Sequence, residues 1–313
     1  MGDDNMKKNT ILCLMGPTAS GKTDLACRLA DERPVEIISV DSAMIYRDMH
    51  IGTAKPDAET LKKYPHQLID IRDPTESYSA ADFCRDAEKA IQAALNNNRL
   101  PVLVGGTMLY FKTLLHGIAD MPSADEATRT AIQEEATEKS WQHLHEQLAK
   151  VDPESAQRIH PNDPQRIARA LEIFRATGKT LTQWWHDAAE HRFPYNAICV
   201  GLIPEDRDEL HARIAQRLDQ MFAAGFVEEV QQLIARYPLD LSMPALRCVG
   251  YRQVWQYLQG EGDLQTCREK SLFATRQLAK RQLTWLRGWP DLEQISPKSL
   301  NNLAQLLRCL PGL

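Results

Sequence analysis

The residues best suited to chemistry lie close to the N-terminus, in the stretch GPTASGKT. Its positions, Gly16, Pro17, Thr18, Ala19, Ser20, Gly21, Lys22 and Thr23, fill the pattern G-x-x-x-x-G-K-[ST]. An apolar run at residues 11–15 precedes them, and apolar residues at helical spacing follow over residues 25–30. We therefore predict a strand, a loop and a helix, the context that disfavours a chance glycine-rich turn.

A loop of this kind captures anions. Its glycines let backbone N–H groups turn inward around a phosphate, and the positive end of the following helix adds to the attraction. Lys22 supplies a mobile positive charge, and the hydroxyl of Thr23 is suited to hold Mg²⁺. The stretch predicts a binding site for a molecule that carries a di- or triphosphate.

A carboxylate follows the next apolar run. Residues 35–40 (VEIISV) indicate a second buried strand, and Asp41 comes directly after it. Ligands of doubly wound sheets bind at the carboxyl ends of the strands, so we expect Asp41 near the phosphate-binding loop. The alternative is that Asp41 caps the segment that follows.

A third apolar run, residues 100–104, ends in Gly-Gly-Thr at residues 105–107. Many P-loop NTPases end this strand in an aspartate that completes the Mg²⁺ shell, and here none is present. The pattern argues against a motor that hydrolyses nucleoside triphosphates and leaves a kinase of a small molecule open.

The elements that must position these residues indicate an α/β fold, a P-loop NTPase-like parallel sheet flanked by helices. Residues 79–97 have a strong helical pattern, and the polar stretch around residues 45–56 is typical of a loop over the site. Residues 120–195 lose the strand pattern and are charged and helical, which predicts an all-helical insertion domain. We expect residues 1–119 and 196–313 to form the catalytic core, with a strand at 196–203 and helices after it.

The composition is that of an ordinary globular protein, with 43% hydrophobic and 25% charged residues in 313. The sequence has no apolar run long enough to span a membrane and no signal-peptide pattern. Its seven cysteines are scattered without a C-x-x-C pair, which favours reduced thiols. We expect a cytoplasmic protein, and nothing demands more than a monomer.

The charge is uneven. The net charge of −5 argues weakly against a nucleic-acid partner, but residues 247–290 hold eight Lys and Arg against three acidic residues. Composition alone leaves two interpretations open, a solvated helix face and a surface that contacts phosphates.

Taken together, the motifs resemble the tRNA dimethylallyltransferase family in its bacterial form. The matching stretches are GPTASGKT (16–23), SVDSAMIYRDMHIGTAKP (39–56), VGGTMLY (104–110), HPNDPQRIARALE (160–172), RCVGYRQVWQYL (247–258) and RQLAKRQLTWLRG (276–288). They follow the family's order over nearly the whole chain, without the zinc-finger extension of eukaryotic members. The resemblance implies transfer of a dimethylallyl group from dimethylallyl diphosphate to N6 of the adenosine at position 37 of tRNA, next to the anticodon. Pyrophosphate is the other product.

The resemblance also implies roles for single residues. Asp41 matches the general base, Lys22 and Thr23 with Mg²⁺ match the site for the leaving pyrophosphate, and Arg217 matches a second pyrophosphate contact. Thr107 matches a residue that orients the target base or the leaving group; a helix cap is its alternative. The implied tRNA contacts are Asp41, Ser42, Ala43, Met44, Thr107, Arg129, Gln165, Arg166, Ile167, Ala168, Arg169, Arg247, Cys248, Val249, Gly250, Tyr251, Arg252, Lys280, Arg281, Gln282, Leu283, Thr284, Trp285, Leu286 and Arg287.

Two further functions stay open at the level of the sequence. A P-loop small-molecule kinase would phosphorylate its substrate with ATP and without RNA. A non-catalytic, nucleotide-gated RNA-binding protein would tolerate Asp41→Ala, because binding needs no base. Trp255, Trp285 and Trp289 fit either stacking platforms for bases or core packing, and we expect core packing.

Overall fold

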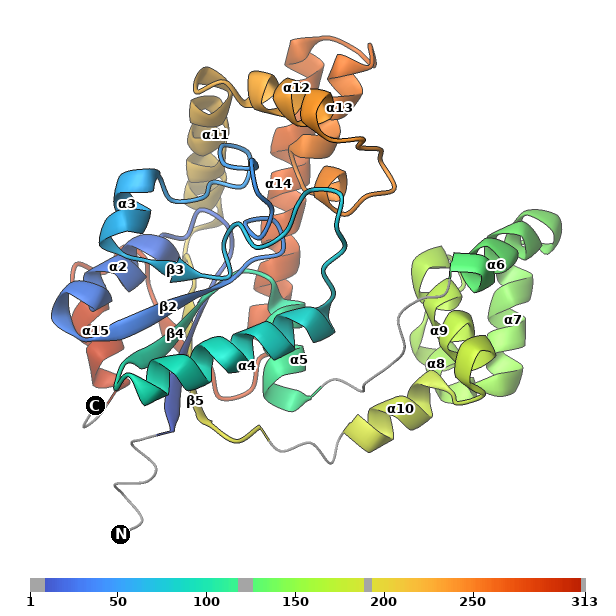
Figure 1. The fold of residues 1–313 in the computed structure, drawn as a ribbon, viewed down its shortest axis with the longest axis horizontal. Helices are drawn as coiled ribbons and strands as arrows, with labels where there is room; N and C mark the ends of the chain where they lie inside the picture. The colour runs from blue at the N-terminus through green and yellow to red at the C-terminus, as the bar shows by residue number, and fades with distance from the viewer. Residues whose placement is uncertain (1–8, 118–125, 189–192, 311–313) are drawn as a thin grey trace. The chain divides into compact units, whose positions relative to one another are not determined.

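The computed structural model describes residues 9–117, 126–188 and 193–310 (Figure 1). The chain divides into two compact units. The first, here the sheet unit, comprises Met1–Phe111 and Pro194–Leu313, and the second, the helical unit, comprises Lys112–Phe193. The helical unit overlaps the insertion expected at residues 120–195.

The described part of the sheet unit holds a six-stranded parallel sheet in the order β3-β2-β4-β1-β5-β6. Its strands are β1 (Thr10–Met15), β2 (Val35–Val40), β3 (His66–Gln67), β4 (Leu100–Gly105), β5 (Asn196–Leu202) and β6 (Glu293–Ile295). Every residue of β1 is buried, as expected of a central parallel strand with both faces covered. The predicted α/β fold with a parallel sheet is confirmed.

The expectation that only helices follow residue 203 is wrong, because β6 pairs with β5 at the edge of the sheet. Only Ile295 of its three residues is buried. A strand this short with one apolar residue carries no periodic signal. The two-residue strand β3 at the opposite edge escaped sequence reasoning for the same reason.

The register of the central strands aligns their carboxyl ends. Gly105 at the end of β4 pairs with Met15 of β1 on one side and with Val40 of β2 on the other. A Cβ atom on Gly105 would lie 2.0 Å from the carbonyl oxygen of Val40, so only glycine fits there. The segments that follow these three strands therefore start at one edge of the sheet.

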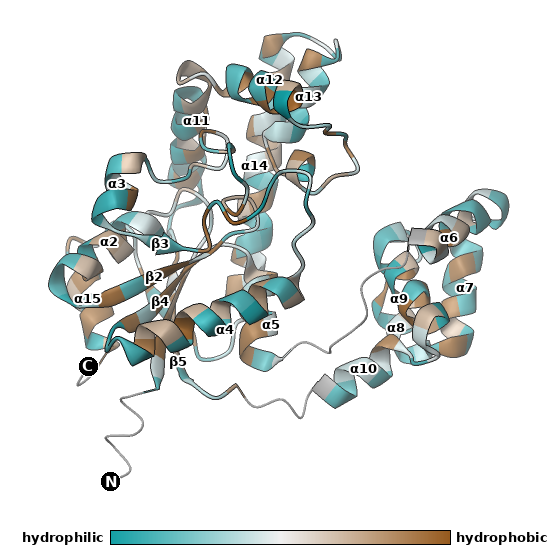
Figure 2. Cartoon of the chain, in the orientation of Figure 1, coloured by the Kyte–Doolittle hydropathy of each residue, from teal (hydrophilic) through white to brown (hydrophobic). Residues whose placement is uncertain are grey.

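Helices flank this sheet, and α2 (Lys22–Glu32), α4 (Ala80–Asn96) and α15 (Asn302–Arg308) pack against its strands. The other described helices of the unit are α3 (Ala58–Lys63), α5 (Met108–His116), α11 (Arg207–Ala223), α12 (Phe226–Arg236), α13 (Tyr251–Leu258) and α14 (Leu264–Arg287), with a short 3₁₀ turn η1 (Ala245–Arg247). Ser79 and Asp82 cap α4 reciprocally, which begins the helix where the pattern predicts it. Hydrophobic residues gather on the strands and on the inward sides of the helices (Figure 2).

The helical unit has a core of its own. Its helices are α6 (Glu126–Lys139), α7 (Trp141–Val151), α8 (Pro153–Arg158), α9 (Pro164–Thr177) and α10 (Leu181–Ala188). Ile132, Leu144, Leu148 and Ile167 are fully buried together. Asp163 caps α9 by accepting a hydrogen bond from the backbone N–H of Arg166, as its position before a proline predicts. A separate core of this kind lets the unit hold its own shape.

The described residues also bear on membrane spans and disulfide bonds. No helix among them has the length and apolar character needed to cross a membrane. Each of the seven cysteines lies in a described segment and is a free thiol.

Candidate active site

A pocket of about 940 Å³ opens in the sheet unit where the central strands end. Its walls come from four regions: the phosphate-binding loop, the segment after β2, the turn after β4, and helices α11 and α14 with the segment before α13. The lining residues used below are Thr18, Ser20, Lys22, Thr23, Asp41, Gly106, Thr107, Arg213, Arg217, Cys248, Arg281, Gln282 and Trp285. The structure thus brings the predicted phosphate-binding loop, Asp41, Thr107 and Arg217 together around one space.

The phosphate-binding loop needs its glycines. Gly21 begins α2 with φ +90°, a left-handed conformation that side chains disfavour. A Cβ on Gly16 would lie 2.8 Å from both the carbonyl oxygen of Leu202 and the hydroxyl of Ser20. Inside the loop the Lys22 amine donates to the carbonyl of Pro17 at 2.6 Å and to the Ser20 hydroxyl at 3.3 Å. The loop holds its own lysine folded over its backbone.

Three cationic side chains lie at this part of the pocket. Lys22 belongs to the phosphate-binding loop, and Arg213 and Arg217 lie one turn apart on α11. Burial, together with the charges of Arg217 and Arg213, lowers the pKa of Lys22 to about 7, and the charge of Asp41 opposes this shift. Burial also lowers the pKa of Arg217. Positive charge is crowded here, so a multiply charged anion would relieve the repulsion.

Arg213 is a site residue that sequence reasoning missed. One of its guanidinium nitrogens would lie 3.4 Å from a Cβ on Gly21, which places it against the phosphate-binding loop. Arg213 and Arg217 lie four residues apart on α11, and that spacing puts them on one face of the helix. That shared face was the signal available.

Asp41 begins a tight turn after β2. Its Oδ1 atom accepts hydrogen bonds from the backbone N–H groups of Ala43 at 2.8 Å and Met44 at 3.2 Å. Asp41 therefore stabilises a turn; the alternative interpretation as a cap is realised here without a helix. No donor from the described part of the chain bonds Oδ2, so this oxygen can accept a proton from a ligand in the pocket.

Thr107 ties the turn after β4 to the turn that holds Asp41. Its hydroxyl accepts a hydrogen bond from the backbone N–H of Ser42 at 3.1 Å, and its own N–H donates to the carbonyl of Val40 at 3.2 Å. Its carbonyl accepts from Tyr110 at 2.9 Å in the first turn of α5. Thr107 thus begins a helix and supports the carboxylate at the same time.

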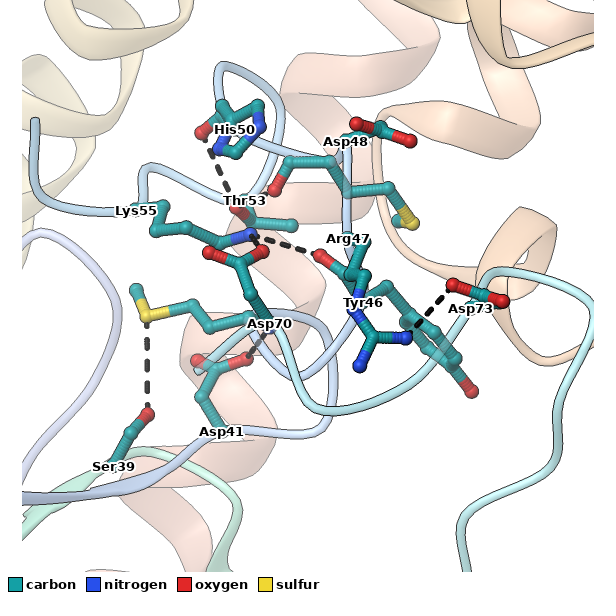
Figure 3. Close-up of polar contacts among 12 residues, drawn as sticks. Ser39, Asp41, Tyr46, Arg47, Asp48, His50, Thr53, Lys55, Asp70 and Asp73 are labelled. Atoms are coloured by element: carbon teal, nitrogen blue, oxygen red, sulfur yellow. Dashed lines mark hydrogen bonds and ion pairs between the residues drawn. The ribbon is translucent and has the colours of Figure 1, made fainter. Parts of the chain in front are cut away.

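The loop that follows Asp41 is firmly anchored. The buried Lys55 amine donates to the carbonyl of Tyr46 at 2.8 Å and contacts the Asp70 carboxylate at 2.5 Å (Figure 3). Farther along the chain, the carboxylate of Glu229 accepts from the N–H groups of residues 50, 51 and 52 at 2.9, 2.7 and 3.2 Å. The hydroxyl of Tyr251 donates to the same carboxylate at 2.6 Å. Distant side chains therefore set the path of this loop.

The segment expected to contact RNA at residues 247–252 divides into two groups. Residues 247–250 line the pocket, whereas Tyr251 is fully buried and holds Glu229. Burial and the nearby Asp41 raise the pKa of the Cys248 thiol to about 12, so the thiol stays protonated. Arg252 is exposed.

The residues of α14 that are expected to contact tRNA also fall into an exposed group and a buried group. Lys280, Arg281 and Arg287 are exposed, whereas Gln282 and Leu286 are buried. The expectation of core packing is wrong for Trp285, whose side chain lies 40% exposed at the pocket. Trp289 is buried and packs edge-on against Phe111, as expected. The apolar side chain of a tryptophan predicts burial. At residue 285, however, α14 borders the open pocket, so the side chain stays partly exposed.

In the helical unit, two residues expected to contact tRNA meet on one carboxylate. Arg129 bonds one oxygen of Glu172 at 2.9 Å, and Arg169 bonds the other at 3.5 Å. The Glu172 side chain is only 5% exposed. Gln165 and Arg166 at the start of α9 are exposed, whereas Ile167 is buried in the core of the unit.

Oxygen donors near the phosphate-binding loop suit a magnesium ion. The Thr23 and Ser20 hydroxyls and the Asp41 carboxylate line the same pocket. Mg²⁺ prefers oxygen ligands and is commonly held by one or two protein groups together with substrate phosphates and water. The residues present fit such an ion.

Comparison with known proteins assigns the family. The sequence matches the model of the IPP transferase family over residues 44–289. The crystal structure of a full-length tRNA isopentenylpyrophosphate transferase from Bacillus halodurans is similar at 36% identity and TM-score 0.70, covering 96% of this chain and 97% of that chain. A tRNA delta(2)-isopentenylpyrophosphate transferase from Staphylococcus epidermidis is similar at 32% identity and TM-score 0.69, covering 96% and 98%. A eukaryotic dimethylallyltransferase acting on tRNA has 26% identity and TM-score 0.79, covering 96% of this chain and 77% of that chain. The chain therefore belongs to the IPP transferase family.

Proposed function

We propose that this protein transfers a dimethylallyl group from dimethylallyl diphosphate to N6 of the adenosine at position 37 of tRNA. The observation that carries the proposal is that one pocket holds both a cationic phosphate-binding loop and the carboxylate of Asp41. The first suits a departing diphosphate and the second an incoming amine. The family and the similar tRNA-modifying proteins support the same activity.

The phosphate-binding loop would stabilise the leaving group. When the allylic carbon–oxygen bond breaks, negative charge builds on the pyrophosphate while positive charge spreads over the allyl group. Lys22, Arg213 and Arg217 line the pocket where that negative charge would develop. Preorganised charges and donors of this kind contribute about 3–4 kcal/mol each to transition-state stabilisation.

We propose that Mg²⁺ takes part in holding the diphosphate, with the Thr23 hydroxyl as the protein ligand. A divalent ion supplies further neutralisation of the charge on the leaving oxygens. Thr23 follows Lys22 at the first turn of α2, where the helix dipole also favours an anion.

Asp41 would act on the nucleophile. The N6 amine is weak because its lone pair is conjugated with the adenine ring, so loss of a proton to a base assists its attack. In the reaction, a nitrogen–carbon bond forms, the carbon–oxygen bond breaks, and one N6 proton passes to Oδ2 of Asp41. Pyrophosphate leaves with the bonding electron pair. Thr107 positions Asp41 through Ser42.

The target base must leave the anticodon loop to reach this carboxylate. Bases in loops stack weakly, so extrusion costs only a few kcal/mol. Trp285, exposed where α14 borders the pocket, is suited to stack on the neighbouring nucleotides. Lys280, Arg281 and Arg287 on the same helix would contact phosphates.

We further propose that residues 1–119 and 196–313 form the catalytic core and that residues 120–195 form a domain that also contacts tRNA. Arg129, Gln165, Arg166 and Arg169 would supply the contacts of that domain. Because the substrate is tRNA, we place the activity in the cytoplasm, and a single chain holds every residue that the reaction uses.

The direct test uses purified protein, unmodified tRNA, dimethylallyl diphosphate and Mg²⁺. We expect pyrophosphate release and a gain in tRNA mass equal to one dimethylallyl group in place of hydrogen. A tRNA with guanosine at position 37 is the control and should stay unmodified. ATP-dependent phosphorylation of a small molecule without RNA would favour the kinase, and RNA binding with no product would favour the non-catalytic protein; either outcome overturns the proposal.

A further inference from the structure

Gln282 is a buried polar side chain that joins two walls of the pocket. It lies on α14 with 8% of its surface exposed. Its Oε1 atom accepts a hydrogen bond from the backbone N–H of Thr18 at 2.9 Å, and its Nε2 atom donates to the carbonyl of Gly106 at 2.9 Å. Thr18 belongs to the phosphate-binding loop, and Gly106 directly precedes Thr107. One side-chain amide therefore connects the two loops.

The turn at Gly106 is shaped to receive this amide. A Cβ atom on Gly106 would lie 2.3 Å from Nε2 of Gln282 and 3.2 Å from the carbonyl oxygen of Gly16. No side chain fits there while the amide stays in place. The absence of a side chain at residue 106 thus lets the turn approach both Gln282 and the phosphate-binding loop.

From this turn the bonding continues to Asp41. The Thr107 hydroxyl accepts from the N–H of Ser42, which lies in the turn that Asp41 closes. A continuous series of hydrogen bonds therefore runs from Thr18, through Gln282 and the Gly106–Thr107 turn, to the segment that carries the carboxylate.

We infer that Gln282 is a positioning residue that fixes the phosphate-binding loop relative to the Asp41 side of the pocket. The inference rests on the proposed function and adds to it a residue whose amide is bonded by the protein at both ends. An amide suits the role because it has an acceptor oxygen at one end and a donor NH₂ group at the other, and the two loops present one N–H and one carbonyl. The spacing between a bound allyl diphosphate and an extruded base depends on these loops, and a misplacement of about 1 Å can cost up to ~10²-fold in rate.

This role differs from the RNA contact that the resemblance implies for residues 280–287. The side chains of Lys280 and Arg281 are exposed, but the Gln282 amide is enclosed and bonded at both ends. An RNA contact would act on affinity, whereas a positioning role acts on the rate of the chemical step.

The first experiment is Gln282→Leu, which keeps the size of the side chain and removes both hydrogen bonds. We expect kcat to fall by roughly 10- to 100-fold, with the Kd for an anticodon stem-loop RNA and for magnesium pyrophosphate changed less than about threefold. Gln265 is the matched control, since it is an exposed glutamine on the same helix that bonds Glu269. Gln265→Leu should leave all three quantities unchanged.

Gln282→Glu gives a readout that loss of packing would not produce. The ionised carboxylate accepts from Thr18 but repels the carbonyl of Gly106, whereas the protonated carboxyl restores a donor. We expect the ratio of variant to wild-type kcat to rise as pH falls. Gln265→Glu should show no such trend.

Gly106→Ala approaches the same contact from the other side. The added methyl group must displace the amide of Gln282, so kcat should fall to a similar extent. If Gly106→Ala acts mainly by displacing the Gln282 amide, its effect on kcat should be much smaller in a protein that already carries Gln282→Ala. Thermal unfolding of each variant confirms that it folds.

The outcomes separate the two proposals. Wild-type protein that never alkylates tRNA overturns the proposed function itself. An active wild type with kcat unchanged in Gln282→Leu overturns only the positioning role. The positioning role is also overturned if RNA affinity falls as much as kcat, or if the pH ratio of Gln282→Glu is flat.

Discussion

The phosphate-binding loop and the loop that carries Asp41 face the same pocket, yet different parts of the sequence hold each in shape. In the first loop, Gly21 takes a left-handed conformation and Lys22 folds back on the carbonyl of Pro17, all within eight residues. The second loop depends on Glu229, which binds its backbone from 179 residues away. The backbone of the phosphate-binding loop is therefore shaped mainly by its own motif, with one distant bond from Gln282 to Thr18, whereas the path of the loop that carries Asp41 depends on the whole fold.

This contrast separates the effects that mutations should have. Changes in the phosphate-binding loop should act on diphosphate binding and on departure of the leaving group. Changes around Asp41 should act on proton transfer or on the position of the base. If a variant of one loop had the kinetic effects expected of the other, the two loops would not have separate roles.

The largest effect is expected from Asp41→Asn. Asparagine keeps an oxygen acceptor for the N–H groups of Ala43 and Met44, so the turn should survive while the base is lost. We expect kcat to fall by about 10²- to 10⁴-fold with RNA affinity largely kept, measured by single-turnover alkylation and RNA binding. Asp57→Asn is the matched control, because Asp57 caps α3 in the same way and lies outside the pocket lining. Comparable losses in both variants would contradict a role for Asp41 as base.

Lys22 should make pyrophosphate binding depend on pH. The pKa of Lys22 is about 7 in the free protein, because burial and the two arginines disfavour its charge. A bound diphosphate favours the charged amine and raises that pKa, so the complex holds more protons than the free protein above pH 7. Affinity should therefore be fully present below pH 7 and fall, by up to about tenfold per unit, as pH rises above it.

Calorimetry in buffers of different ionisation enthalpy measures this uptake directly. At pH 8 we expect wild-type protein to take up a proton on binding magnesium pyrophosphate. Lys22→Met gives the baseline for protons that the ligand itself exchanges. Equal uptake by the two proteins would show that Lys22 does not change its charge.

Glu229→Gln tests whether the Asp41 loop depends on its distant anchor. The neutral amide accepts more weakly than a carboxylate, and one of its ends donates, so part of the bonding to residues 50–52 is lost and the rest is weakened. We expect unfolding to become easier by about 1–3 kcal/mol, measured in urea. We also expect kcat to fall roughly tenfold because Asp41 is less well placed. Glu228→Gln is the control, because Glu228 is the adjacent residue in the chain and its side chain is exposed.

What the sequence could predict follows the same division. The phosphate-binding loop and the placement of Asp41 beside it follow from a short motif and a strand end, which report local geometry, whereas the roles of Asp41 and Thr107 follow from the family resemblance. Glu229 was not, because a glutamate in the first turn of α12 has an ordinary explanation in the helix dipole. The same limit applies to Gln282, whose two partners lie 264 and 176 residues away. Motifs indicate which residues line the pocket, and only the fold shows which residues hold them there.

The smallest effect, and one that should touch neither loop, is expected from Lys280→Ala combined with Arg281→Ala. Both side chains are exposed on α14, where they would contact phosphates of tRNA. Each phosphate contact that is lost reduces the number of counterions released when tRNA binds. The slope of log K against log salt concentration should therefore become shallower by about 1 to 2. Lys270→Ala, an exposed lysine nearer the start of α14, is the control. If the salt slope stayed unchanged while kcat fell, α14 would act through the pocket and not through the RNA backbone, and the division between binding surface and reacting loops would fail.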